Sequence, residues 1–332
     1  MRYRPMQPND VRECVEIIAQ HPVIGPRYGS VIADLPTAWL RVLSSEAASA
    51  FVLHAEEGVG APICGLNVNV FVNDDFVQEL KTPPHFWIGP ELTKRIVRGD
   101  SPLLSEKQLR DANSRGGLNL VAWEGCGSHL FAADPELHRC GMEAFIQVNL
   151  GYLWKEAISS QAESAGRLQQ LTKTGGLLWD AAANSYVDTF NGNAEALVSR
   201  PHVVGIRRKE LLEQSWMSAG SWVGRLFDYH PPVLGFNRSE QRVLTVALTG
   251  ATDEQLSSTL GISIPAIKKT WASIYHRVAD HLPELVRDAL QSDAGGAPRG
   301  REKRRDLLAY LREHPEELRP VSRKLLLRLV RG

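Results

Sequence analysis

The stretch 252–277, TDEQLSSTLGISIPAIKKTWASIYHR, constrains the fold most, because it joins two helix patterns through a sharp turn. Thr252 opens the capping-box pattern T-x-x-Q, which marks the start of a short helix. Gly261 supplies the left-handed backbone conformation in which helices often end. Ser263 is placed to cap the next helix, and Pro265 falls in its first turn, where proline is tolerated. The stretch therefore predicts a short helix, a tight turn and a longer helix.

A further helix is expected directly before this pair, over residues 239–248, with Ser239 as its N-cap and Gly250 just after its end. The apolar residues of the three helices recur at helical spacing and predict a shared core; they are Val243, Leu244, Ala247, Leu248, Leu256, Leu260, Ile267, Ile274 and Val278. The opposite face of the longest helix then carries small or basic residues, namely Lys268, Lys269, Thr270, Ala272 and Ser273.

Three helices of this kind have the layout of a helix-turn-helix, whose second helix enters the major groove of DNA. Lysines on that helix neutralise phosphates or reach guanine edges. A plain three-helix bundle with a solvated basic face would show the same spacing, so both interpretations stay open on spacing alone.

Charge is distributed unevenly along a chain whose net charge is zero. Residues 1–230 contain 21 basic and 26 acidic side chains, whereas residues 231–332 contain 17 and 12. The basic C-terminal part indicates either an anionic partner or a solvated basic tail.

The segment 234–292 resembles the LuxR/GerE-type helix-turn-helix of transcriptional regulators. The residues that carry the resemblance are Phe236, Glu240, Val243, Leu244, Gly250, Thr252, Leu256, Ile262, Ser263, Ile267, Lys268, Ile274 and Tyr275. The resemblance implies binding of double-stranded DNA by Thr252, Ser263, Lys268, Lys269, Thr270, Ser273 and Arg277. Of these, Ser263 would orient the recognition helix, and Thr252 and Arg277 would touch phosphates. Three positions, Glu254, Thr270 and Ala272, lack the basic residue or histidine that the family often has there, which weakens the expected phosphate contacts.

A single helix-turn-helix with few phosphate contacts should bind DNA weakly, so we expect a homodimer or a second basic element. The pairing helix would span 282–291, with apolar residues Leu282, Leu285, Val286 and Leu290 that equally suit packing onto the first helix. The segment from Arg299 to Arg305 would be a flexible basic arm. A chain ending near Gln291 should then bind DNA more weakly, with a shallower dependence on salt.

The chain is expected to form an α+β domain over 1–230, a helix-turn-helix domain over 231–292, and a linker with a basic helical tail over 293–332. The boundary is placed at two prolines after His230, and the linker at SDAGGAPRG. Alternating or β-branched runs predict strands near 48–57, 61–74, 118–125, 185–190 and 202–206. Residues 141–161 are predicted to form one long helix and 165–174 a shorter one. The sheet is expected to be mixed or antiparallel.

The order of elements in 1–230 is faintly similar to the GNAT acyltransferase fold, on the stretches RPMQPNDVRECVEII and AGRLQQLTKTGG. That family binds the pyrophosphate of acetyl-CoA on a glycine-rich helix start. The nearest segment here, Gln147 to Tyr152, is out of register and has bulky residues where glycines are needed. We therefore expect a domain that has lost the transferase activity, and expect no cofactor; an active N-acetyltransferase is the alternative.

Other candidate sites are weaker. Cys126, His129, His138 and Cys140 are zinc-ligand types, although their spacing matches no common zinc module. Asp74 and Asp75 could act as acid or base, but NDD is also a common turn sequence. The tryptophans at 87, 123, 154, 179, 216 and 222 could line a pocket or fill the core. No catalytic residue is predicted, because no Ser-His-Asp set, P-loop or dinucleotide motif is present.

The four scattered cysteines, the absence of a long apolar run and the polar N-terminus favour a cytoplasmic protein without a membrane segment. The sequence thus predicts a transcriptional regulator whose N-terminal domain senses a small-molecule or protein effector. A protein-binding adaptor is a further option, which predicts partner binding without DNA.

Overall fold

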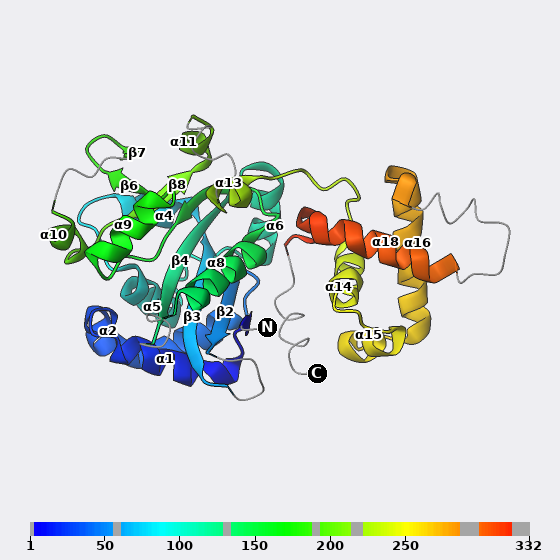
Figure 1. Ribbon diagram of the computed structural model, residues 1–332, viewed down its shortest axis with the longest axis horizontal. Helices are drawn as coiled ribbons and strands as arrows, with labels where there is room; N and C mark the ends of the chain where they lie inside the picture. The colour runs from blue at the N-terminus through cyan, green and yellow to red at the C-terminus, as the bar shows by residue number, and fades with distance from the viewer. Residues whose placement is uncertain are drawn as a thin grey trace. The chain divides into compact units, whose positions relative to one another are not determined.

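The computed structural model describes residues 3–55, 61–128, 134–187, 193–213, 222–285 and 299–320. The chain divides into two compact units, Met1–Asp228 and Tyr229–Gly332, which we call unit 1 and unit 2 (Figure 1). The division falls two residues before the predicted domain boundary. In the described residues, no helix is long and apolar enough to cross a membrane.

Unit 1 is built on one eight-stranded mixed sheet, which confirms the predicted α+β class. The strand order is β1-β2-β3-β4-β5-β8-β6-β7, and every neighbouring pair is antiparallel except β4 and β5, which are parallel. The strands are β1 (Tyr3–Pro5), β2 (Ala48–His54), β3 (Ile63–Val72), β4 (Leu118–Gly127), β5 (Trp154–Ile158), β6 (Leu177–Asp180), β7 (Ser185–Val187) and β8 (Val204–Arg207).

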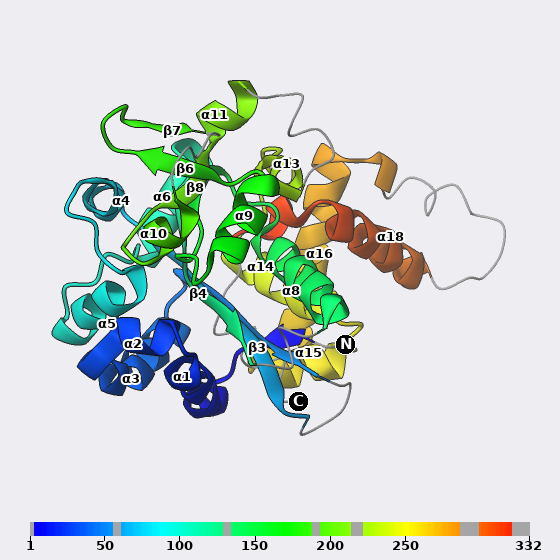
Figure 2. The same ribbon diagram turned by 60° about the vertical axis from the view of Figure 1, so that its left-hand side comes forward.

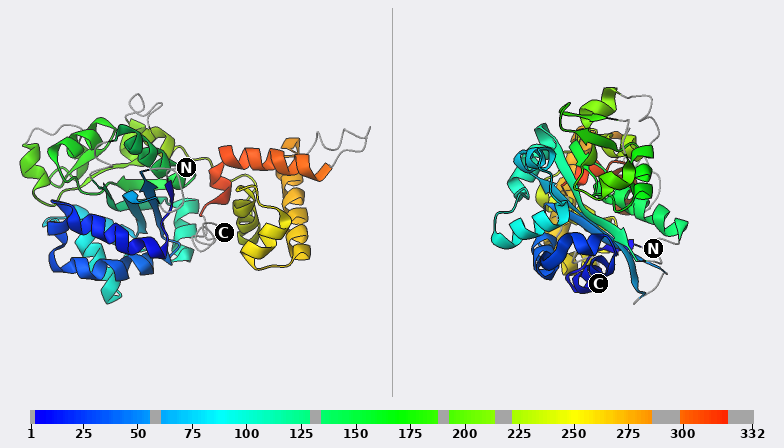
Figure 3. Two further views of the ribbon diagram at one scale, coloured as in Figure 1. Left: turned by 60° about the horizontal axis from the view of Figure 1, so that its bottom comes forward. Right: turned by 90° about the vertical axis from the view of Figure 1, so that its left-hand side faces the viewer.

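Helices cover both faces of this sheet, so strands β2 and β3 are buried almost throughout. Helices α1 (Val11–Gln20), α3 (Leu35–Leu43) and α5 (Ile88–Arg98) pack on one face, and α8 (Pro135–Asn149) packs on the other (Figure 2 and Figure 3). The remaining helices of unit 1 are α2 (Ile24–Tyr28), α4 (Asp74–Lys81), α6 (Glu106–Arg115), α9 (Ala165–Lys173), α10 (Ala194–Val198), α11 (Arg208–Glu213), α13 (Trp222–Phe227) and two 3₁₀ helices, Pro8–Asp10 and Gly29–Asp34.

The predicted long helix over 141–161 is wrong in its second half. Helix α8 ends at Asn149, and Gly151 follows with a positive φ of 80°. The chain then enters β5, where the buried residues Trp154, Glu156 and Ile158 alternate with less buried ones. A parallel partner, β4, satisfies the backbone of this short segment, and that long-range pairing outweighs its local helical pattern. The shorter helix is confirmed as α9.

Unit 2 is helical and contains α14 (Arg238–Ala247), α15 (Asp253–Leu260), α16 (Ile264–His281), α18 (Arg299–Glu313) and a 3₁₀ helix, Pro315–Leu318. The predicted capping box at Thr252 is present, and Gly261 has the expected left-handed backbone with φ 68°. The predicted cap Ser239 is wrong. Asn237 caps α14 instead, because its side chain accepts hydrogen bonds from the N–H groups of Ser239 and Glu240.

Helix α18 belongs to the core of unit 2 and is not a flexible basic arm. Four buried leucines of α18 and the 3₁₀ helix join the cluster that holds α14, α15 and α16 together; they are Leu307, Leu308, Leu311 and Leu318. The carboxylate of Glu317 accepts hydrogen bonds from the N–H groups of Val233 and Leu234, which ties both ends of unit 2 together. Most of the predicted pairing helix, 286–291, lies outside the described residues, while Leu282 and Leu285 pack partly buried against this core.

Candidate functional site

Lys268 and Lys269 lie on the exposed side of the first turns of α16. The rotation of this helix is fixed by its buried face, which consists of Ile267, Trp271, Ile274 and Val278. Neither lysine forms a hydrogen bond or an ion pair with the part of the chain that the structure describes. Two exposed positive charges thus lie on the N-terminal half of a well-anchored helix, and that of Lys268 is close enough to Glu254 to help lower the pKa of this carboxyl group.

The hydroxyl groups of the threonines and of Ser263 that were predicted to contact DNA form hydrogen bonds within their own helices. Oγ1 of Thr252 accepts a hydrogen bond from the Gln255 N–H at 3.3 Å, and Oγ of Ser263 accepts one from the Ala266 N–H at 3.4 Å. Oγ1 of Thr270 donates to the carbonyl oxygen of Ala266 at 3.0 Å. Thr252 and Ser263 are nevertheless exposed at two adjacent helix starts, and the first turn of α15 also carries the acidic residues Asp253 and Glu254.

Ser273 and Arg277 are both engaged by one carboxylate of α14, although Ser273 is exposed and lies one turn after Lys269 on α16. Oγ of Ser273 donates to Oε1 of Glu240 at 2.7 Å, and Nε of Arg277 lies 3.2 Å from Oε2 of the same carboxylate. Glu240 is 1% exposed and belongs to α14. Both side chains therefore serve the packing of α16 against α14, which the sequence pattern did not indicate.

Arg304 of α18 fastens this tail helix to the start of α15 and to α16. Its guanidinium donates to Oδ1 of Asp253 at 2.9 Å and to the carbonyl oxygen of Ala251 at 2.7 Å. The same group lies 4.6 Å above the ring of Trp271, which in turn stacks on Tyr275. A hollow of about 320 Å³ opens here on the surface of α16, lined by Asp253, Lys268, Trp271, Ala272, Tyr275 and Arg304.

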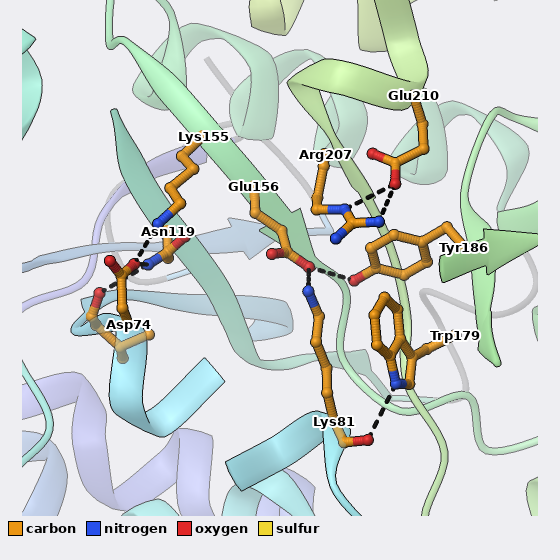
Figure 4. Close-up of polar contacts among 10 residues, drawn as sticks. Asp74, Lys81, Asn119, Lys155, Glu156, Trp179, Tyr186, Arg207 and Glu210 are labelled. Carbon is orange, nitrogen blue, oxygen red and sulfur yellow. Dashed lines mark hydrogen bonds and ion pairs between the residues drawn. The ribbon is translucent and has the colours of Figure 1, made fainter. Parts of the chain in front are cut away.

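Unit 1 contains a buried polar cluster that sequence reasoning missed (Figure 4). Lys81, at the end of α4, forms an ion pair with Glu156 of β5, and both residues are less than 5% exposed. The Tyr186 hydroxyl donates to Glu156 at 2.6 Å, and the Lys81 ammonium lies 4.4 Å from the Trp179 ring. Burial lowers the pKa of Lys81 and raises the pKa of Tyr186 well above its usual value. No local pattern indicated this cluster, because Glu156 fell within the segment that was predicted as helix.

Asp74, one of the candidate acids, is held as a carboxylate. Asn73 caps α4, and Oδ1 of Asp74 accepts hydrogen bonds from Lys155 and Asn119, each at 2.7 Å (Figure 4). These bonds, that of Lys155 first, lower the pKa of Asp74. The Asp74 and Asp75 pair therefore begins a helix, and Asp74 has a structural partner on the start of β5.

Glu124 of β4 is a buried carboxyl group with a strongly raised pKa. Burial raises its pKa to about 7, although the Tyr28 hydroxyl donates to its Oε1 at 2.7 Å. Gly89 permits this approach, because a Cβ at that position would lie 2.2 Å from the Tyr28 oxygen and 2.5 Å from the Glu124 carboxylate. The paired register of β4 and β5 ends at Val121 and Ile158, so Glu124 lies beyond it. Nothing in the local sequence distinguished this glutamate.

The remaining candidates do not come together as a site. In the described residues, no group of three His, Cys, Asp or Glu side chains could hold a metal ion; of the predicted set, Cys126, His138 and Cys140 are described and His129 lies outside. Gln147 lies near the C-terminal end of α8, away from any helix start.

The tryptophans mostly fill the core rather than line a pocket. Trp123 and Trp154 are fully buried, Trp179 belongs to the polar cluster, and Trp87 lies beneath the Arg27 guanidinium at 4.0 Å. Trp216 and the Trp222 side chain lie outside the described residues.

Comparison with known proteins gave no match: no family model, no curated protein and no solved structure is similar to this chain.

Proposed function

We propose that this protein is a sequence-specific DNA-binding transcriptional regulator that uses α15 and α16 as a LuxR-type helix-turn-helix. In this proposal α16 enters the major groove of double-stranded DNA, and Lys268 and Lys269 contact bases or phosphates. The exposed starts of α15 and α16, at Thr252 and Ser263, approach the backbone of the duplex.

The observation that carries the proposal is the exposed pair Lys268 and Lys269 on a helix whose opposite face is buried in the core of unit 2. The positive φ of Gly261 and the cap at Ser263 set the turn between α15 and α16, and such a turn joins the two helices of a helix-turn-helix. Unit 1 is then the part that senses a small-molecule or protein effector, and the active species is a homodimer.

The test measures binding of the full chain to duplexes selected from a random library, by fluorescence anisotropy at several salt concentrations. The variant K268A/K269A should bind the selected duplex at least on the order of tenfold more weakly, since it removes about two phosphate or base contacts. The matched control, K94A/K107A, removes two exposed lysines from unit 1 and should bind like the wild type. No complex between the wild type and any duplex at about 50 mM salt would overturn the proposal.

An N-acyltransferase activity of unit 1 is the second candidate, and Glu124 is the observation that favours it. A buried carboxyl group with a pKa of about 7 is suited to accept a proton from an amine near neutral pH. The position of Gln147 at the end of α8 speaks against it, because a pyrophosphate-binding loop belongs at a helix start. Calorimetry with acetyl-CoA decides between the two: micromolar binding would establish the acyl-CoA site, and absence of heat would remove it.

A further inference from the structure

The tail helix α18 forms one wall of a groove on unit 2, and arginines dominate that wall. The groove has a volume of about 570 Å³ and is lined by Ala247, Gly250, Ala251, Thr252, Asp253, Glu254, Arg304, Arg305, Leu308 and Arg312. Its opposite wall is the turn between α14 and α15 together with the first turn of α15. Three arginines therefore line the groove opposite the start of α15, which itself contributes the acidic Asp253 and Glu254.

The three arginines differ in how far their charges are neutralised. Arg304 is paired with Asp253 and covers Trp271, so it is a structural residue. Arg305 and Arg312 are exposed; the first contacts only its chain neighbour Asp306, and the second has no ion pair within the described ranges. Because they are seven residues apart, they lie on one face of α18, about 10 Å from each other along the helix.

The groove continues into the hollow on α16. Asp253 and Arg304 line both depressions, and the hollow on α16 also carries Lys268 and Ala272. Along this path from α16 to α18, four basic residues face two acidic ones; the basic residues are Lys268, Arg304, Arg305 and Arg312, and the acidic ones are Asp253 and Glu254.

If α16 enters the major groove, the groups that this path would bind are the phosphates of the DNA backbone. The exposed Glu254 stands on the first turn of α15 and would repel a passing strand. On the opposite wall, Arg305, whose ion pair is with the neighbouring Asp306, and the exposed Arg312 supply the positive charge that the helix-turn-helix itself lacks there. Arginine also suits the geometry, since its planar group binds phosphate oxygens in pairs.

We propose that α18 is a third DNA-contacting element, in which Arg305 and Arg312 bind phosphates of the duplex that α16 reads. The inference rests on the proposed function of unit 2 and adds a contact that the two helices of the motif do not provide. Phosphate contacts do not distinguish one base from another. They should therefore increase the affinity for selected and scrambled duplexes by the same factor.

The experiment compares the wild type with R305A/R312A in the full chain, using a selected and a scrambled duplex over a series of potassium chloride concentrations. We expect affinity for both duplexes to fall on the order of tenfold at about 0.1 M salt, and the slope of log K against log salt to become shallower by about 1–2. R305K/R312K should restore most of the binding, because it restores the charges. The control R98A/R115A removes two exposed arginines from unit 1 and should behave as the wild type.

The outcomes separate the two proposals. If K268A/K269A loses binding while R305A/R312A keeps the wild-type affinity and slope, α18 makes no contact and only this inference is overturned. If the wild type binds no duplex at all, the proposed function is overturned, and the inference falls with it. Circular dichroism of R305A/R312A should match the wild type, since both side chains are exposed.

Discussion

Ser273 of α16 and Glu240 of α14 are joined by a hydrogen bond of 2.7 Å between Oγ and Oε1. The same carboxylate accepts the Asn237 N–H at 2.9 Å, as part of the capping box of α14, and pairs with Arg277. One buried side chain thus closes the start of α14 and sets the position of α16.

Replacing Glu240 with alanine should therefore destabilise unit 2 by about 2–3 kcal/mol. This is less than the ~3–5 kcal/mol typical of breaking a fully buried pair, because Arg277 is one-third exposed and stays partly hydrated. Urea unfolding followed by circular dichroism measures the change. Glu284→Ala, at an exposed position, is the control, and an E240A chain as stable as the wild type would contradict the assigned role.

Replacing Lys81 with methionine should destabilise unit 1 by roughly 3–5 kcal/mol, since it leaves the Glu156 charge buried without its counter-ion. The double variant K81M/E156Q should recover much of this loss, because both charges are then gone. The exposed pair Lys155 and Asp74 provides the matched comparison: K155M should cost less than about 1 kcal/mol. Equal losses of stability for K81M and K155M would show that the buried ion pair contributes no more than the exposed one.

Glu124 should make unit 1 less stable as the pH rises. Its pKa is raised to about 7 in the folded chain from an ordinary 4.5, so the folded state holds the proton more tightly. The stabilisation is fully present below about pH 4.5, declines as the pH approaches 7 and is lost above it, with a total of about 3 kcal/mol. Urea unfolding at pH 5 and pH 8 should show this difference in the wild type and its absence in E124Q. If the stabilities of the wild type and of E124Q changed with pH in the same way, the raised pKa of Glu124 would be refuted.

Removing α18 should unfold unit 2. A chain ending at Gln291 lacks Leu307, Leu308, Leu311 and Leu318, so the buried faces of α14 and α16 become exposed to water. We expect loss of the helical signal of unit 2 by circular dichroism and rapid proteolysis within 231–285. Two point variants on α18 refine the test: L307D should have the same effect, whereas A309D, on the exposed side, should be nearly neutral. A truncated chain that keeps its helices would show that α18 is dispensable for folding.

The local signals in the sequence predicted α15, α16 and the turn between them well, because caps and turns depend on neighbouring residues. The Thr252 capping box, the left-handed Gly261 and the Ser263 cap each need only three or four consecutive positions. The mixed sheet class likewise followed from alternating apolar residues in β2 and β3.

Features that depend on distant partners could not be predicted in this way. Strand β5 has five residues, and its pairing with β4 decides its conformation. The polar cluster brings Lys81, Glu156 and Tyr186 together from three separate stretches of the chain. Ser273 and Arg277 were expected to face DNA because their spacing fits the exposed side, and the buried carboxylate that binds them lies 33 and 37 positions earlier.

The packing of α18 also determines when unit 2 can fold during synthesis. When His281 leaves the ribosome, α14, α15 and α16 are complete, but the leucines up to Leu318 and the Glu317 carboxylate that holds Val233 and Leu234 are still missing. At about 5–20 residues per second, these arrive roughly two to seven seconds later. Helix α16 therefore emerges early and gains its fixed surroundings late, so a chain whose synthesis ends between the two points has an α16 with an exposed apolar face.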